Sequence, residues 1–163
     1  MRLTAIAAAV TLLAGVAHAE SHGGTVAPDD VKYGEYGAVA ESLTGMPGDA
    51  ANGQQVFATK SMGNCVSCHA VAQLPDVPFQ GEVGPELTWT GEARTAEELR
   101  GIVANAKMSF EGTVMPAFYK TSGFTRPGDG YTGKAAAEED LEPILTAQQV
   151  EDVVAFLLTL KEQ

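Results

Sequence analysis

The chain is short of cysteine, tryptophan and basic side chains. Its 163 residues include two cysteines, one tryptophan and 10 lysines and arginines, against 21 aspartates and glutamates. Two cysteines exclude a framework of several disulfides. The formal net charge of -11 repels nucleic acid and anionic membrane surfaces, so we expect neither as a partner.

No apolar run reaches the length of about 20 residues that a membrane-spanning helix needs. The longest extends from Ile6 to Val16; it follows the basic start Met1-Arg2 and precedes the small-x-small sequence Ala17-His18-Ala19. These three features in this order are typical of a secretory signal peptide. We therefore expect cleavage after Ala19, and a periplasmic mature protein without a membrane span.

Both cysteines lie in one short motif, Cys65-Val66-Ser67-Cys68-His69. The pattern C-x-x-C-H is the attachment site of a c-type haem. Its two thiols form thioethers with one porphyrin, and the adjacent imidazole supplies an axial ligand. The motif predicts a single covalent haem c, bound by Cys65 and Cys68 and ligated by His69.

A disulfide, a redox pair and a zinc site are the alternatives for these residues. Redox pairs with the C-x-x-C spacing normally lie in a βαβ pattern, which the flanking sequence lacks. Structural zinc takes four Cys or His ligands, and outside the motif the mature chain offers only the distant His22. Export together with the adjacent His69 favours haem.

A methionine is the expected second axial ligand, because His/Met ligation is typical of electron-transfer haems and raises their potential. Met115 lies in an irregular loop, and Pro116 after it restricts its backbone to extended conformations. We predict Met115 as the ligand. Met108, which follows the middle helix, is the first alternative; His22 or an open sixth position are the others.

Three further residues are predicted to contact the cofactor. A metal-bound histidine donates its free ring N–H to an oxygen acceptor, and the Pro85 carbonyl in the Gly84-Pro85 turn is the candidate. Leu87 is a candidate neighbour of the ring. The indole N–H of Trp89 is a candidate partner of a propionate, although Trp89 could equally be a core residue.

The fold is predicted to be all-α. Asp49 is placed to cap a helix from Ala50 to about Thr59, and the Thr95–Glu98 capping box starts a second helix ending near Ala106. A third helix follows the capping box at Thr146–Gln149. Their apolar residues recur at helical spacing, so we expect three or more helices around one covalently bound haem.

The remaining segments are predicted to be irregular. Residues 20–48 form an N-terminal arm, and residues 49–163 form the haem domain. Within that domain, 121–143 is rich in glycine and is interpreted as a surface insertion, with a short acidic helix from Ala135 to Leu141 as one hypothesis.

The order of these elements resembles the class I cytochromes c: helix, C-x-x-C-H, Gly-Pro-x-Leu, helix, Met-Pro and terminal helix, over Asp49 to Lys161. Two longer stretches, Gly81–Leu87 and Val114–Tyr119, are similar to the SoxX family, the monohaem subunits of SoxAX complexes. The terminal stretch from Pro143 to Leu157 resembles the same family.

This resemblance implies a subunit role. Cys65 and Cys68 would bind the haem, and His69 and Met115 would be the axial pair. The partner would be a SoxA-like cytochrome, and the complex would oxidatively join thiosulfate to a cysteine of a SoxYZ-like carrier, as an L-cysteine S-thiosulfotransferase. This subunit, without a catalytic centre of its own, would accept electrons and pass them to a small cytochrome c.

Two other functions compete with this interpretation. The first is a free periplasmic cytochrome c that shuttles electrons. The second is a haem enzyme such as a peroxidase, which needs a vacant sixth position and an acid–base group nearby. Besides His69 the mature chain has only His22, so the enzyme is the least favoured.

Overall fold

The computed structural model describes residues 24–125, 127–128, 133–137 and 141–161. The predicted signal peptide and the alternative ligand His22 lie outside this range. Across the described residues the chain contains helices and no strand. The four α-helices are α1 (Ala50–Ala58), α2 (Thr90–Ala93), α3 (Ala96–Asn105) and α4 (Ala147–Thr159); the 3-10 turns are η1 (Pro28–Asp30), η2 (Glu35–Gly37), η3 (Cys65–Ser67) and η4 (Ala106–Met108).

Local caps explain where the three longer helices begin. The Asp49 carboxylate accepts the N–H groups of the first turn of α1, and complete capping boxes start α3 at Thr95 and α4 at Thr146. Each cap satisfies N–H groups that have no partner inside the helix. All three predicted starts are confirmed. The four-residue α2 was not predicted, and no side chain caps it.

Helices α1 and α4 cross at very short range. A Cβ placed on Gly53 would lie 1.9 Å from the carbonyl oxygen of Asp152, so only glycine fits there. A glycine inside a helix costs about 1 kcal/mol relative to alanine, and the close crossing accounts for its presence here. Beside it, the rings of Phe57 and Phe156 pack with centroids 5.4 Å apart, and the Asp152 carboxylate accepts from the Asn52 amide.

The core lies between these helices and the segments that wrap them. Most of the apolar residues that recur at helical spacing are buried, whereas Ile102 and Leu158 are half-buried. The buried members include Gly53, Val56 and Phe57 of α1, Leu99 and Val103 of α3, Ala106 of η4, Val150, Val153, Val154 and Leu157 of α4, and Leu160 just after it.

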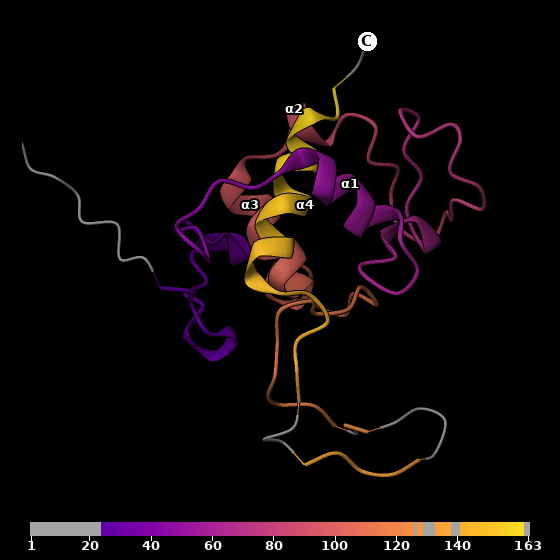
Figure 1. Cartoon of the computed structure of the whole chain (residues 1–163). Helices are drawn as coiled ribbons and strands as arrows, with labels where there is room; N and C mark the ends of the chain where they lie inside the picture. The colour runs from indigo at the N-terminus through magenta and orange to yellow at the C-terminus, as the bar shows by residue number, and fades with distance from the viewer. Residues whose placement is uncertain (1–23, 126, 129–132, 138–140, 162–163) are drawn as a thin grey trace, which may run out of the picture.

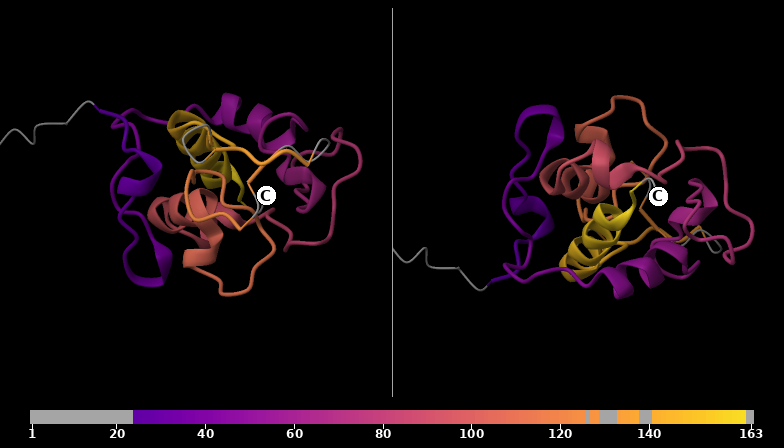
Figure 2. Two further views of the ribbon diagram at one scale, coloured as in Figure 1. Left: turned by 90° about the horizontal axis from the view of Figure 1, so that it is seen from below. Right: turned by 90° about the horizontal axis from the view of Figure 1, so that it is seen from above.

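The N-terminal arm, residues 24–48, packs against α3 and α4. In all three views of Figures 1 and 2 it lies on the opposite side of these helices from the segment that carries the C-x-x-C-H motif. Val39 and Leu43 of the arm are buried in the common core, and the Val39 N–H donates to the Glu97 carbonyl at 2.9 Å. The arm is therefore held by both apolar and backbone contacts.

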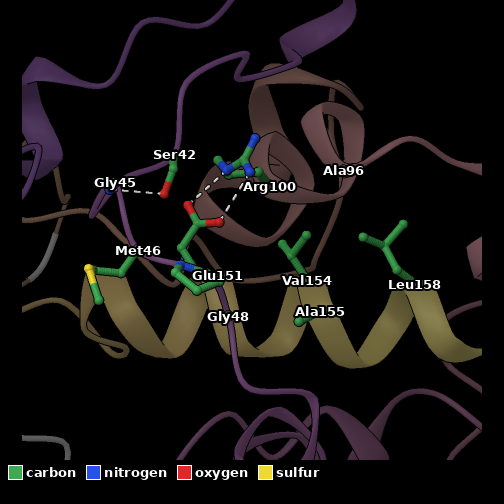
Figure 3. Close-up of a pocket in the computed structure, with 11 residues that line it drawn as sticks. Ser42, Gly45, Met46, Gly48, Ala96, Arg100, Glu151, Val154, Ala155 and Leu158 are labelled. Carbon is green, nitrogen blue, oxygen red and sulfur yellow. Dashed lines mark hydrogen bonds and ion pairs between the residues drawn. The ribbon is translucent and has the colours of Figure 1, made fainter. Parts of the chain in front are cut away.

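A buried ion pair ties the arm to both helices (Figure 3). The Arg100 guanidinium donates to both oxygens of Glu151, at 2.8 and 3.1 Å, and to the Val39 carbonyl at 2.8 Å. The same carboxylate accepts the Leu43 N–H at 2.7 Å. The pair lines an open groove of about 360 Å³ between the arm, α3 and α4.

The described parts of residues 121–143 project away from the helices (Figure 1). Here the hypothesis of a helix from Ala135 is wrong over Ala135–Ala137, because Ala135 forms an isolated antiparallel bridge with Gly128. Ala135 and Ala137 are exposed, so these two residues contribute no buried apolar surface to support a helix. Helices this short are marginal in water without such packing.

Within the part of the chain that the structure describes, no helix combines the length and the apolar character needed to cross a membrane.

Candidate haem site

The turn η3 presents the two cysteines together. Asn64, in the left-handed conformation with φ 49°, begins the turn. The N–H groups of Cys68 and His69 then both donate to the Cys65 carbonyl, at 3.1 and 2.9 Å. Cys65 and Cys68 are half-buried free thiols, not a disulfide. Their placement on one turn suits attachment to two vinyl groups of one ring.

The chemistry of these thiols does not fit a redox or zinc site. Burial raises the pKa of the Cys65 thiol to about 12, whereas redox-active cysteines have a lowered pKa. Among the described residues no group of three or more His, Cys, Asp or Glu side chains could hold a metal ion. Two thiols and a histidine on one short turn fit a covalently attached haem.

Hydrogen bonding fixes the orientation of the His69 ring. Its Nδ1–H donates to the Pro85 carbonyl oxygen at 2.7 Å, the acceptor proposed from the sequence. Because a carbonyl can only accept, the proton lies on Nδ1, and Nε2 is left with a lone pair for a metal. The Gly84 N–H donates to the Cys68 carbonyl at 2.8 Å, which anchors the Gly84-Pro85 turn to the motif.

Only glycine at position 84 leaves room for this ring. A Cβ there would lie 2.2 Å from Cε1 and 2.6 Å from Nδ1 of His69. The Gly-Pro turn therefore positions the imidazole by shape as well as by its hydrogen bond.

Replacing Gly84 with alanine should displace the His69 ring and weaken its bond to iron. We expect a larger high-spin fraction in the ferric absorption spectrum and a loss of stability of about 1–3 kcal/mol, which is typical of overpacking. Gly34→Ala is the control, because the nearest atom to a Cβ at that position is 3.5 Å away. Equal spectra for the two variants would show that Gly84 does not position the ring.

The structure separates the two candidate methionines. Met115 is half-buried and packs against the core, whereas Met108, the last residue of η4, is 49% exposed. The backbone of Met115 is held on both sides: its N–H donates to the Thr113 hydroxyl at 3.2 Å, and its carbonyl accepts from Lys107 Nζ at 2.6 Å. Met115 therefore remains the favoured axial ligand.

The other two predicted contacts lie in different environments. Leu87 is half-buried against the core, and its N–H donates to the Ala70 carbonyl at 2.9 Å. Trp89 is 49% exposed, so it is not a core residue. A contact between its indole and a propionate stays a prediction.

Two glutamines stabilise the loop between His69 and Thr88, and neither was identified from the sequence. Gln80 accepts from the Val71 N–H at 2.6 Å and donates to the Leu74 carbonyl at 2.7 Å. Gln73 donates to the Thr88 carbonyl at 2.8 Å. No motif marks an amide side chain for this role, because its partners are backbone groups.

Exposed apolar side chains lie on the loop that contains the Gly84-Pro85 turn and on the loop that contains Met115. Val83 precedes the Gly84-Pro85 turn and Val114 precedes Met115, and both are exposed. Phe79 is exposed too, in a left-handed conformation with φ 62°. An electron-transfer protein needs such apolar surface to exclude water where its partner docks.

Comparison with known proteins decides the family. The sequence model described as "Cytochrome c" matches residues 50–161. The chain belongs to the cytochrome c family. No curated protein matched the chain. Among solved structures, a chain of the SoxXA crystal structure from P. pantotrophus is similar, with 59% sequence identity and a TM-score of 0.80 over 85% of this chain and 99% of that one.

These matches confirm the prediction of an all-α, class I cytochrome c-like fold and the resemblance to the SoxX family. The cytochrome binds haem c covalently, and it is a monohaem electron-transfer protein, since the sequence holds the cysteines for one attachment site. The free shuttle is the less supported of the two electron-transfer interpretations.

Proposed function

We propose that this cytochrome is the electron-accepting subunit of a periplasmic heterodimer with a SoxA-like cytochrome. The 59% identity to a chain of SoxXA, over 99% of that chain, carries the proposal. The match covers 85% of this chain, so it extends beyond residues 50–161, which the family model matches. A protein that matches nearly all of a SoxXA chain at this identity is expected to assemble in the same way.

Four residues hold the cofactor in this proposal. Cys65 and Cys68 would form the thioether bonds, and His69 and Met115 would bind the iron. The bound haem supplies one-electron chemistry. The methionine sulfur of Met115 would keep the potential of the haem high. The hydrogen bond from His69 Nδ1–H to the Pro85 carbonyl at 2.7 Å would orient the imidazole.

The sulfur chemistry takes place on the other subunits. Joining thiosulfate to the cysteine of a SoxYZ-like carrier breaks the S–H bond of the thiol, forms a sulfur–sulfur bond, and releases one proton and two electrons. This chain has no cysteine besides Cys65 and Cys68, and haem attachment uses both, so no sulfur nucleophile remains. The subunit therefore receives the electrons and passes them to a small cytochrome c, without a catalytic centre of its own.

Reconstitution tests this proposal. The holoprotein, co-expressed with a SoxA-like cytochrome, should elute with it as one heterodimer on size exclusion. Thiosulfate plus the carrier should then reduce the haem of this subunit, and omission of either the carrier or the SoxA-like cytochrome should abolish the reduction. Elution of this cytochrome alone, with its haem reduced through transient encounters, would instead establish the free shuttle.

A further inference from the structure

We propose that Lys107 and Thr113 form a clamp that holds the axial methionine on the iron by binding its backbone. The proposal rests on the assignment of Met115 as the axial ligand. It assigns Lys107 and Thr113 as positioning residues, which act on the metal site only through Met115.

The loop that carries Met115 has little secondary structure to hold it. Residues 111–117 all belong to the described part of the chain. Within them, one backbone–backbone hydrogen bond is formed, from the Thr113 N–H to the Phe110 carbonyl at 3.3 Å. The regular bonds lie outside this span, for example from the Tyr119 N–H to the Ala104 carbonyl at 3.0 Å. Side chains must therefore fix the position of Met115.

Both backbone polar groups of Met115 bind side chains. Thr113 Oγ1 accepts its N–H at 3.2 Å, and Lys107 Nζ donates to its carbonyl at 2.6 Å. The next residue, Pro116, has no N–H to offer and a fixed φ. Three successive constraints thus converge on the one residue whose side chain must point at the iron.

The backbone of Lys107 is fixed in a position from which its side chain reaches the Met115 carbonyl. It lies in η4, where its N–H donates to the Asn105 side chain at 3.3 Å, and the neighbouring Ala106 is buried. The base of the lysine is therefore fixed to the end of α3, while its ammonium reaches the loop. Hydrogen bonds with a charged donor are the stronger kind, although exposure to water reduces their net value.

Binding of an added ligand measures how often Met115 leaves the iron. Imidazole binds the ferric haem only while the methionine is away, so its apparent affinity is proportional to the open fraction. Lys107→Met keeps the length of the side chain and removes the donor. We expect it to raise the imidazole affinity about 3- to 10-fold, which corresponds to the net free energy of one hydrogen bond. Thr113→Val should have an effect of similar size.

Conservative variants and a matched control separate the clamp from general effects of charge and stability. Lys107→Arg and Thr113→Ser keep the donor or acceptor and should restore the affinity to within about twofold. Lys120→Met removes the same charge and another lysine-to-loop bond, that to the Gly123 carbonyl at 3.3 Å, and should leave imidazole binding unchanged. Urea unfolding of each variant tests whether imidazole affinity follows global stability.

Met115→Ala distinguishes the two ways in which the inference can fail. If Met115→Ala leaves imidazole binding unchanged, Met115 is not the ligand, and the axial assignment falls together with the clamp. If Met115→Ala raises the affinity strongly but Lys107→Met behaves like Lys120→Met, the ligand assignment stands and the clamp is wrong.

Discussion

Replacing Met115 with alanine should abolish the charge-transfer band between methionine sulfur and ferric iron, and should lower the reduction potential of the haem. The potential falls because the His/Met pair raises it relative to other ligand pairs. Added imidazole should bind far more tightly, because nothing then competes for the sixth position. If Met115 leaves the iron about 1% of the time, the gain in apparent affinity is about 100-fold.

Met108→Ala is the matched control, since it truncates the other methionine considered as a ligand. Its side chain is half exposed at the end of η4, so we expect the band, the potential and imidazole binding to stay as in the unmodified protein. Loss of the band in Met108→Ala, with retention in Met115→Ala, would exchange the two assignments. Absorption spectroscopy and a redox titration of both holoproteins decide the question.

The features that could be predicted from the sequence are those that depend on near neighbours. Asp49, Thr95 and Thr146 cap helices whose N–H groups lie two or three residues away, and a cap needs no knowledge of the rest of the fold. The C-x-x-C-H motif is similarly local. The covalent chemistry of haem attachment follows from five consecutive residues.

The position of the arm could not be predicted in this way. The contact between the Val39 N–H and the Glu97 carbonyl joins residues far apart in sequence, and the arm has no helical or strand period. The structure shows that Arg100 and Glu151 lie beside apolar positions of their helices and are nevertheless buried. A buried charge needs a partner. Arg100 and Glu151 bind each other and also the backbone of the arm, and the apolar pattern of α3 and α4 does not reveal this contact with a third segment.

The histidine side of the haem site lies between these two cases. Chemistry predicts that His69 needs an acceptor for its ring N–H, and the nearby Gly-Pro turn offered the Pro85 carbonyl. The steric role of Gly84 depends on how closely the ring approaches the backbone, with a would-be Cβ at 2.2 Å. Distances of that kind become available only in the folded structure.

Replacing Arg100 with methionine should destabilise the protein by about 3–5 kcal/mol, the usual result of leaving a buried charge without its partner. The Glu151 carboxylate would lose both bonds from the guanidinium, and the Val39 carbonyl would lose its donor. We therefore expect a lower urea midpoint and faster proteolysis of the arm. Because the arm lies on the far side of α3 and α4 from the C-x-x-C-H motif (Figure 2), the haem spectrum of the folded variant should be unchanged.

Arg94→Met provides the comparison, because it removes the exposed pair with Glu98 at 3.2 Å, in which the arginine side chain is 42% exposed. Exposed pairs contribute about 0.2–1 kcal/mol, so the loss of stability should be severalfold smaller for Arg94→Met than for Arg100→Met.

The double variant Arg100→Met, Glu151→Met removes the unpaired charge but still leaves the Val39 carbonyl and the Leu43 N–H without partners. It should recover part of the stability and not all of it, since each orphaned group costs about 1–3 kcal/mol. Full recovery would show that the bonds from the pair to the arm add nothing to stability. Partial recovery would mean that the pair stabilises the fold by binding the arm.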